Sequence, residues 1–284
     1  MTNHYVLPTA GAEIAYDVYG SGGPPLLMIG QPMVASGFTA LRSHFTDRTV
    51  VTYDPRGIGR SVRTDGRVEN DPVVQAGDVH AVIEAVGGPV EMFASSGGAV
   101  TALALVTAYP DDVTTLVAHE PPLVRPLPDA EAAARAGVAM RAAYQAHGSG
   151  AGMAAFMALG MWSGEFTDAY FAQAAPDPAQ FGLSAEDDGS RDDPLLSDRS
   201  VAITDYIVDP AALAAAPTRV VIAVGEESAG VFTGRTAVAT AELLGQRATV
   251  FPSHHGGFMG GEFGYAGQPE AFARRLREVL AGSV

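Results

Sequence analysis

The sequence contains no cysteine and no lysine. Without cysteine the chain can form no disulfide and no thiolate metal site, and it has no thiol nucleophile. All 17 basic residues are arginine, against 32 acidic residues, and the formal net charge is −15. A charge of this sign argues against binding to nucleic acid or to an anionic membrane surface. We therefore expect a small-molecule partner, and the composition leaves the oligomeric state open.

Long hydrophobic runs are also missing. Residues 1–20 show no basic segment followed by an apolar run, so we expect no secretory signal peptide. No apolar stretch is long enough to cross a bilayer, and a cytoplasmic protein is the expectation. What the sequence does contain is 47% hydrophobic and only 17% charged residues over 284 positions. That balance is typical of one large globular domain, or of one domain with a large insertion.

Short continuous apolar runs recur along the chain and predict parallel strands that are covered on both faces. Two alternating strands come first, and the full set of expected strands is 4–7, 13–19, 25–29, 50–53, 90–93, 115–118, 219–224 and 248–251. Helical patterns lie between them, at 36–45, 72–86, 98–109, 231–244 and 269–281. Alternating strands and helices predict an α/β fold with a mostly parallel, doubly wound sheet.

One interval breaks this alternation. Residues 121–216 contain no convincing strand, and a simple crossover between parallel strands needs far fewer residues. We interpret them as a helical lid, or cap, inserted into a core made of residues 1–120 and 217–284. A helix is expected at 129–147, followed by an apolar face that forms the interior of the lid and part of a pocket. That face consists of Met153, Phe156, Met157, Met161 and Trp162.

The most informative segment is residues 90–106, where an apolar run meets Ala94-Ser95-Ser96-Gly97-Gly98 and an Ala-rich helical run follows. A nucleophile elbow needs this order of strand, sharp turn and helix, with small residues on both sides of the nucleophile. Ser96 is the candidate, because Ala94 and Gly98 then occupy the two small positions. A plain Gly/Ser turn is the alternative interpretation.

A serine nucleophile needs a general base and a carboxylate that orients the base. We assign the base to His255, because its glycines directly follow it in a loop after the last strand. His254 is the alternative. For the acid we choose Glu227, with Glu226 next and Glu120 third. The order Ser96, Glu227, His255 then runs nucleophile, acid, base.

An oxyanion hole needs two backbone N–H groups. We assign one to Gly97, which follows the nucleophile, and the other to Gln31, which follows the strand at 25–29. The side chain of Gln31 would then face the pocket. A plain Gly-Pro turn is the alternative interpretation of residues 29–33.

Taken together, these motifs resemble the α/β-hydrolase fold superfamily, and the resemblance covers the whole chain. Four segments carry it: residues 53–61 (YDPRGIGRS), the elbow at Ser96, residues 225–227 and residues 251–258. The resemblance implies a structural role for residues 53–61, holding a turn near the oxyanion loop. Three features depart from the common pattern. Ile29 stands where a histidine is usual, the acid is a glutamate, and the nucleophile is a serine. The last feature argues against the dehalogenases and epoxide hydrolases that use an aspartate.

We therefore expect a serine hydrolase that cleaves an ester, a lactone or a related acyl substrate through an acyl-enzyme. No cofactor and no metal ion are implied; the acidic run at 186–193 lacks the glycine-centred spacing of a calcium loop. Acyl transfer, perhydrolysis and C–C bond hydrolysis use the same three residues and stay open. A non-catalytic ligand-binding protein with this fold is the alternative from another class.

Overall fold

The computed structural model describes residues 2–262, 264 and 266–282. In these residues nine strands form one mixed sheet of order β1-β2-β4-β3-β6-β7-β8-β9, and β5 pairs with β2. The β1–β2 and β2–β4 pairs are antiparallel, and every later pair in this order, from β4–β3 to β8–β9, is parallel. The strands are β1 Thr2–Thr9, β2 Ala12–Tyr19, β3 Leu26–Gln31, β4 Val50–Tyr53, β5 Val62–Arg63, β6 Val90–Ser96, β7 Val113–His119, β8 Arg219–Gly225 and β9 Thr249–Phe251.

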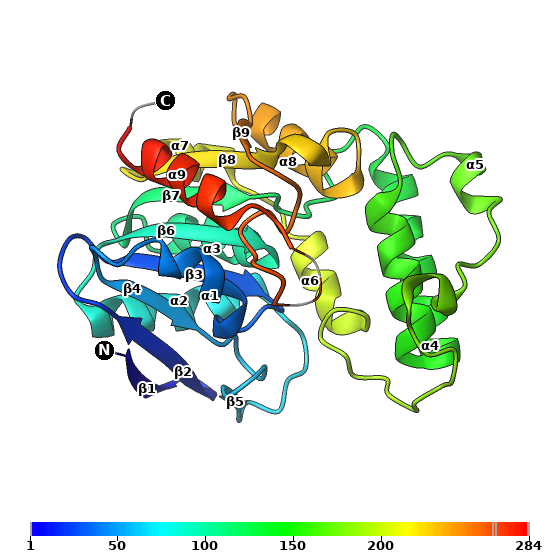
Figure 1. Cartoon of the computed structure of the whole chain (residues 1–284), viewed down its shortest axis with the longest axis horizontal. Helices are drawn as coiled ribbons and strands as arrows, with labels where there is room; N and C mark the ends of the chain where they lie inside the picture. The colour runs from blue at the N-terminus through cyan, green and yellow to red at the C-terminus, as the bar shows by residue number, and fades with distance from the viewer. Residues whose placement is uncertain (1, 263, 265, 283–284) are drawn as a thin grey trace.

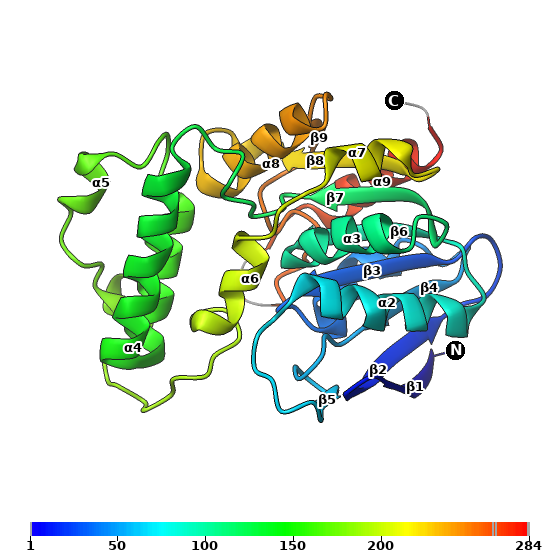
Figure 2. The ribbon, with the colours of Figure 1, turned by 180° about the vertical axis from the view of Figure 1, so that it is seen from behind.

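Helices cover both faces of the sheet, as Figures 1 and 2 show from opposite sides. One face carries α2, α3, α7 and α8, and the other carries α1 and α9. The α/β architecture predicted from the alternating patterns is confirmed. These helices are α1 Thr39–Ser43, α2 Pro72–Val86, α3 Gly97–Ala108, α7 Pro210–Ala215, α8 Phe232–Leu243 and α9 Pro269–Leu280.

The alternation of side chains along each strand fills two separate cores. In β3, Leu27 and Ile29 pack with the α2 and α3 side, whereas Leu26 and Met28 pack with the α1 and α9 side. All four side chains are at most 1% exposed. A strand that is apolar on both faces must be covered on both, which explains the continuous apolar runs in the sequence.

Local sequence signals mark both ends of α2, and the helix spans the predicted residues 72–86. Asp71 caps its first turn by accepting hydrogen bonds from the backbone N–H groups of Val73 and Val74, and Pro72 starts the helix. Gly87 ends it in the left-handed conformation, at φ 79°. A cap, an initial proline and a terminal glycine are each favourable at these positions.

Between β7 and β8 the chain leaves the sheet and forms a separate helical layer. Its longest helix, α4 (Ala130–Met161), stands beyond the carboxyl ends of the parallel strands (Figure 1). The short helices α5 (Asp168–Phe171) and α6 (Val201–Thr204) follow it. This inserted segment has its own apolar cluster, in which Ala136, Met140 and Tyr144 are buried. That it acts as a lid stays a prediction.

Helix α4 consists of two helical runs. Gly148, at φ 80° and ψ −169°, interrupts the helical backbone directly after the helix predicted for residues 129–147, and a second helical run follows. Of the predicted apolar face, Met153, Phe156 and Trp162 pack against the cluster of the inserted segment, whereas Met161 is 68% exposed. Among the described residues, no helix combines the length and the apolar character that a membrane crossing requires.

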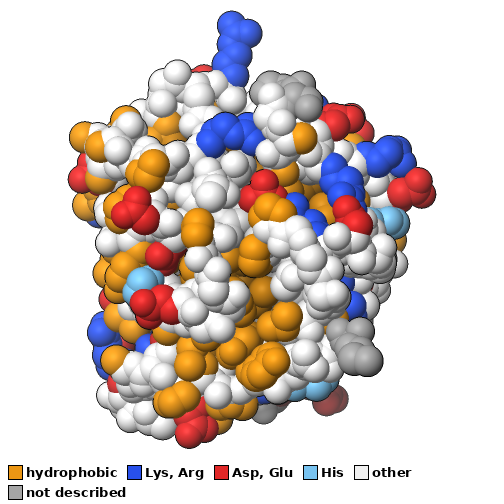
Figure 3. Space-filling model, turned by 90° about the vertical axis from the view of Figure 1, so that its left-hand side faces the viewer, with side chains coloured by type: hydrophobic (Ala, Val, Ile, Leu, Met, Phe, Trp, Pro, Cys, Tyr) orange, Lys and Arg blue, Asp and Glu red, His pale blue; other side chains and the backbone are white. Residues whose placement is uncertain are grey.

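The end of the molecule opposite to α4 carries the amino ends of the parallel strands. Figure 3 shows hydrophobic side chains gathered in its lower half, with basic and acidic side chains next to one another around them. Ion pairs join the layers at this end: Arg48 contacts Glu91 at 2.6 Å, and Arg277 pairs with Asp47.

Candidate active site

A sharp turn joins β6 to α3 at Ser96. Its backbone has φ 57° and ψ −130°, a conformation that residues other than glycine rarely adopt. The predicted order of strand, turn and helix is therefore present, with Ser96 at the strained position. Backbone strain of this kind costs about 1–3 kcal/mol and tends to persist at functional sites.

Small residues make this turn possible. A Cβ atom added to Gly98 would lie 2.6 Å from the Cα atom of Gly30 in β3, and one added to Gly97 would lie 2.8 Å from the carbonyl oxygen of Gln31. No real side chain fits at such distances. The two glycines thus allow α3 to start directly against the end of β3, which brings the backbone of Gln31 next to Ser96 and Gly97.

The neighbouring serine has a different environment. Ser95 is 1% exposed, and its hydroxyl lies 3.3 Å from Nδ1 of His119 inside the core. Ser96 is half-buried and stands at the sheet edge. Because successive strand side chains point to opposite faces, only one of the two serines can face the site. Exposure and backbone strain both favour Ser96.

The loop after β9 brings His255 to the same edge. Nδ1 of His255 lies 2.7 Å from Oε2 of Glu120, within hydrogen-bonding distance. The Glu120 side chain is completely buried, whereas the His255 side chain is 37% exposed. The imidazole of His255 is therefore positioned by a buried carboxylate, while part of its ring stays exposed.

Glu120 follows β7 directly and has a positive φ of 47°. Its Oε1 accepts a hydrogen bond of 2.8 Å from the backbone N–H of Gly225. Burial by itself raises the pKa of this carboxyl, but the hydrogen bonds with His255 and Ser228 and the nearby imidazoles outweigh it. The net pKa of Glu120 lies well below its ordinary value, so the side chain is an anion fixed against the imidazole.

The structure does not bring Glu227 to His255. Glu227 and Glu226 are both exposed, and the backbone N–H of Glu227 donates to the carbonyl of Ser253. Oε1 of Glu226 accepts from the backbone N–H of Ser253 at 3.3 Å. Our choice of acid therefore changes from Glu227, the first candidate, to Glu120, the third, which we propose as the acid on the basis of its contact with His255. The physical reason is that β8 ends beside β7, so Gly225 meets Glu120 while the two following glutamates turn outward.

The second histidine of the loop, His254, has contacts within the loop itself. Its Nδ1 accepts a hydrogen bond of 3.0 Å from the backbone N–H of Gly256, and its Nε2 lies 3.2 Å from the carbonyl oxygen of Ala266. These contacts shape the turn that presents His255.

His119 lies between Ser95 and the Glu120–His255 pair. Its ring centre lies 6.0 Å from that of His255, and its Nε2 lies 3.9 Å from Oε1 of Glu120. Complete burial lowers the pKa of His119 from 6.5 to about 4. We expect it to be neutral at physiological pH, behind the Glu120–His255 pair. Its position at a strand end hinted at the site, but the residue carries no motif by which the sequence assigns it a role.

The loop after β3 is fixed by Asp54. Oδ1 of Asp54 accepts a hydrogen bond of 2.8 Å from the backbone N–H of Ala35, and its Oδ2 accepts one of 2.9 Å from that of Arg60. Gln31, which pairs with Ser96 in the β3–β6 register, is 4% exposed. The structural role that the resemblance implies for residues 53–61 is thus confirmed for Asp54. Ile29, where a histidine is usual, is a fully buried core residue.

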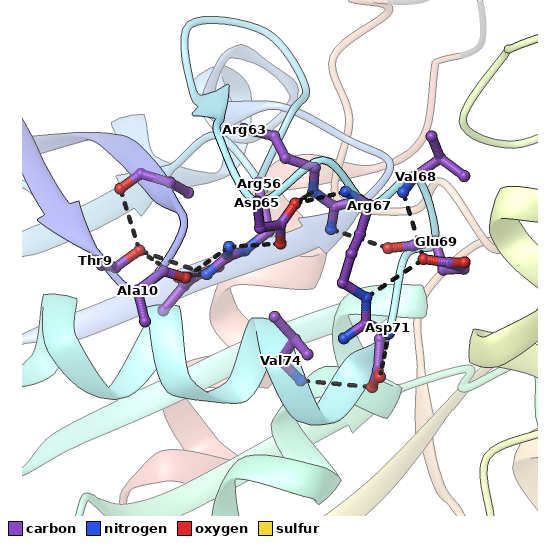
Figure 4. A network of polar contacts seen from close by, with 12 residues as sticks. Thr9, Ala10, Arg56, Arg63, Asp65, Arg67, Val68, Glu69, Asp71 and Val74 are labelled. Carbon is purple, nitrogen blue, oxygen red and sulfur yellow. Dashed lines mark hydrogen bonds and ion pairs between the residues drawn. The ribbon is translucent and has the colours of Figure 1, made fainter.

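Arg56 from the same segment joins a buried polar network. Its guanidinium contacts Asp78 of α2 at 2.8 and 2.6 Å and Asp65 at 3.1 Å. Figure 4 shows the side chain reaching from the turn to Thr9, Ala10 and Asp65. The exposed fractions of the Arg56 and Asp78 side chains are 2% and 1%. This network connects the turn to β1 and α2, and none of its hydrogen bonds involves Ser96.

Two clefts lie elsewhere. One is formed by Ser149, Gly150 and the acidic residues near 187, and the other lies between the inserted segment, the Val224–Glu226 turn and α8. Neither is lined by Ser96, Glu120 or His255, so we locate the site by its geometry. Among the described residues no group of three or more side chains is placed to hold a metal ion.

The sheet order, the strained serine after β6 and the histidine loop after β9 define an α/β-hydrolase fold. A solved α/β hydrolase from Sphaerobacter thermophilus superimposes over nearly the whole chain. It is 21% identical, with 97% of this chain and 100% of that one covered and a TM-score of 0.64. An epoxide hydrolase from Vigna radiata overlaps only in part: it is 20% identical over 42% of this chain and 40% of its own, with a TM-score of 0.39.

At the sequence level, an uncharacterised hydrolase of Bacillus subtilis (strain 168), YraK, is 36% identical over 126 residues. The match covers 43% of this chain and 46% of YraK, so the chain spans about half the length of this curated relative. No family model matches the sequence.

Proposed function

We propose that this protein is a serine hydrolase that cleaves an ester, a lactone or a related acyl substrate. The observation that carries the proposal is the 2.7 Å contact between the buried Glu120 carboxylate and His255, at the same sheet edge as the strained Ser96. The fold and the word hydrolase in the name of YraK agree with this class of reaction.

In the proposed mechanism Ser96 attacks the acyl carbonyl while Nε2 of His255 takes the hydroxyl proton. Glu120 accepts a hydrogen bond from Nδ1–H and stabilises the imidazolium that forms. The backbone N–H groups of Gly97 and Gln31 bind the developing oxyanion. His255 then returns the proton to the leaving alcohol, and a water molecule, activated in the same way, releases the acid product from Ser96.

The substrate's apolar part would meet the inserted segment. That segment stands beyond the carboxyl ends of the strands, where Ser96 and Glu120 are, and it contributes half-buried apolar side chains such as Met153 and Phe156. Apolar side chains with a few polar groups are typical of small-molecule sites. We therefore propose the inserted segment as a lid over an acyl group of small to medium size.

The test is hydrolysis of p-nitrophenyl esters of short carboxylic acids by the wild-type protein and by S96A. We expect release of p-nitrophenol that depends on Ser96 and shows an initial burst equal to the protein concentration when deacylation is slow. Hydrolysis that persists in S96A would place the nucleophile elsewhere. A panel with lactones, alcohols as acyl acceptors, and hydrogen peroxide then separates hydrolysis from acyl transfer and perhydrolysis.

A further inference from the structure

The side chain of Gln31 is buried without a hydrogen-bond partner. Among the residues that the structure describes, neither its Oε1 nor its Nε2 has a partner, although the residue is only 4% exposed. The two other buried amide side chains, Asn70 and Gln75, each keep one contact: Asn70 donates to the Pro194 carbonyl, and Gln75 accepts from Thr101. Leaving a buried polar group unsatisfied costs about 1–3 kcal/mol.

This amide lies beside the proposed oxyanion hole. Gln31 is the register partner of Ser96, and a Cβ atom added to Gly97 would lie 3.0 Å from its Cβ and 3.2 Å from its Cγ. The side chain therefore rests on the Cα of Gly97, and its amide begins one bond beyond Cγ. The terminal torsion of glutamine is soft, so the amide can change its orientation when a substrate binds.

We propose that the Gln31 side chain is a specificity determinant that recognises a hydroxyl or amide group next to the reacting carbonyl of the substrate. The inference rests on the proposed function. Because the backbone N–H of the same residue would hold the oxyanion, the substrate atoms nearest to the side chain would be those adjacent to that carbonyl. Its amide offers a donor and an acceptor side by side, and a hydroxyl or an amide can satisfy both.

A site built to form hydrogen bonds discriminates against an analogue that lacks the polar group, because its own polar atoms then stay unsatisfied. The preferred substrates would thus be 2-hydroxyacyl or similar esters and not plain fatty acyl esters. Apolar side chains of the inserted segment would accommodate the rest of the molecule.

The experiment compares p-nitrophenyl 2-hydroxypropanoate with p-nitrophenyl propanoate. Each kcat/KM is divided by the rate constant for hydroxide-catalysed hydrolysis of the same ester, which removes the intrinsic difference in reactivity. We expect the wild-type protein to prefer the hydroxy ester by about 10-fold to 100-fold after this correction, the range that one or two hydrogen bonds supply.

Q31M removes the amide, keeps the side-chain length and keeps the backbone N–H. We expect it to abolish the preference, so that the corrected kcat/KM values of the two esters become equal. M33L, a change in the same loop, is the matched control and should keep the preference. Should Q31M fail to fold, as judged by circular dichroism, Q31E serves instead: it is of equal size, offers only acceptors, and should reduce the preference.

The two possible failures can be told apart. If both esters are hydrolysed in a Ser96-dependent manner without preference, or if the preference survives in Q31M, the role of Gln31 is refuted and the proposed function stands. If neither ester is hydrolysed by the folded wild-type protein and Ser96 reacts with no acylating reagent, the proposed function fails and the inference falls with it.

Discussion

Arg56–Asp78 and His255–Glu120 each join a basic side chain to a buried carboxylate, but they differ in what surrounds them. Arg56 and Asp78 expose 2% and 1% of their side chains, so their contact is closed on both sides. In the other pair Glu120 is completely buried while His255 exposes 37% of its side chain. The first pair is closed to a bound molecule, whereas the second leaves part of an imidazole exposed, and we propose that this imidazole exchanges a proton with the substrate.

The backbone around the two pairs differs in the same sense. Asp78 lies within the regular helix α2, whereas Ser96 and Glu120 both have positive φ angles and stand at strand ends. Backbone strain tends to persist where function requires it. The comparison separates residues that stabilise the fold from residues that we propose to react.

The largest effect is expected for S96A. It should lower kcat/KM for a p-nitrophenyl ester by about 10⁴-fold to 10⁶-fold, because the attacking oxygen is lost. Since alanine carries the same backbone strain, the free energy of unfolding should change by less than about 1 kcal/mol. S95A is the matched control. It removes only a contact with His119 and should lower activity by less than about 10-fold, the value of one hydrogen bond.

E120Q should come next. A neutral amide no longer stabilises the imidazolium, so we expect kcat to fall by about 10⁴-fold. E227Q and E226Q are the matched controls, and both should stay within about 3-fold of the wild type, since exposed charges contribute little. Ester hydrolysis under saturating substrate measures the three variants. A larger loss in E227Q than in E120Q would mean that the loop rearranges when substrate binds.

D78N should lower stability and leave activity nearly unchanged, the opposite of S96A and E120Q. It leaves the buried Arg56 guanidinium without its main counter-charge, which we expect to lower the free energy of unfolding by about 3–5 kcal/mol. Activity per folded molecule should hardly change. Urea unfolding followed by circular dichroism measures the loss, and D65N, at a carboxylate that is 18% exposed, should cost less. An intact fold with lost activity in D78N would contradict the structural role.

The smallest effect is a pH dependence of stability that comes from His119. Its folded-state pKa is about 4 against an ordinary 6.5, because burial disfavours the charged ring. Between these values the unfolded chain binds more protons than the folded one, so stability is lost as the pH falls from 6.5 to 4. This loss should approach about 3 kcal/mol.

H119F tests this contribution, because the site already packs against Phe93, Phe258 and Phe272. Urea unfolding at pH 7 and at pH 4.5 should show a smaller difference for H119F than for the wild type. Glu120 acts in the same direction but at lower pH: its pKa is lowered as well, so its stabilising contribution is lost only as the pH falls below its ordinary pKa. An unchanged difference in H119F would assign the acid sensitivity to other groups.

The sequence patterns predicted the sheet well because continuous apolar runs have few other interpretations. Strand β4 and helix α2 match their predicted ranges, since a buried run and a complete set of caps mark them. The short strand β5 and the helices α5 and α6 had no such signal. The helix predicted for residues 129–147 ends at Gly148, whose backbone is not helical, and the second helical run of α4 follows it.

The candidate site was predictable for residues that local turn chemistry identifies. The small neighbours of Ser96 and the glycines after His255 are visible in the sequence. The acid was not, because the choice among Glu120, Glu226 and Glu227 depends on how far β7 and β8 extend at the sheet edge. Glu120 accepts one hydrogen bond from the backbone N–H of Gly225 and one from His255. This arrangement depends on tertiary structure, which the local sequence does not reveal.

The central claim is that Ser96 is the nucleophile activated by His255 and Glu120. Reaction with a fluorophosphonate, followed by mass spectrometry of the intact protein and of its peptides, tests this claim most directly. We predict one phosphonyl adduct on the peptide that contains Ser96, normal labelling in E227Q, and labelling at least about 100-fold slower in E120Q. An unlabelled wild-type protein that is correctly folded, or an adduct on any other residue, would contradict the account.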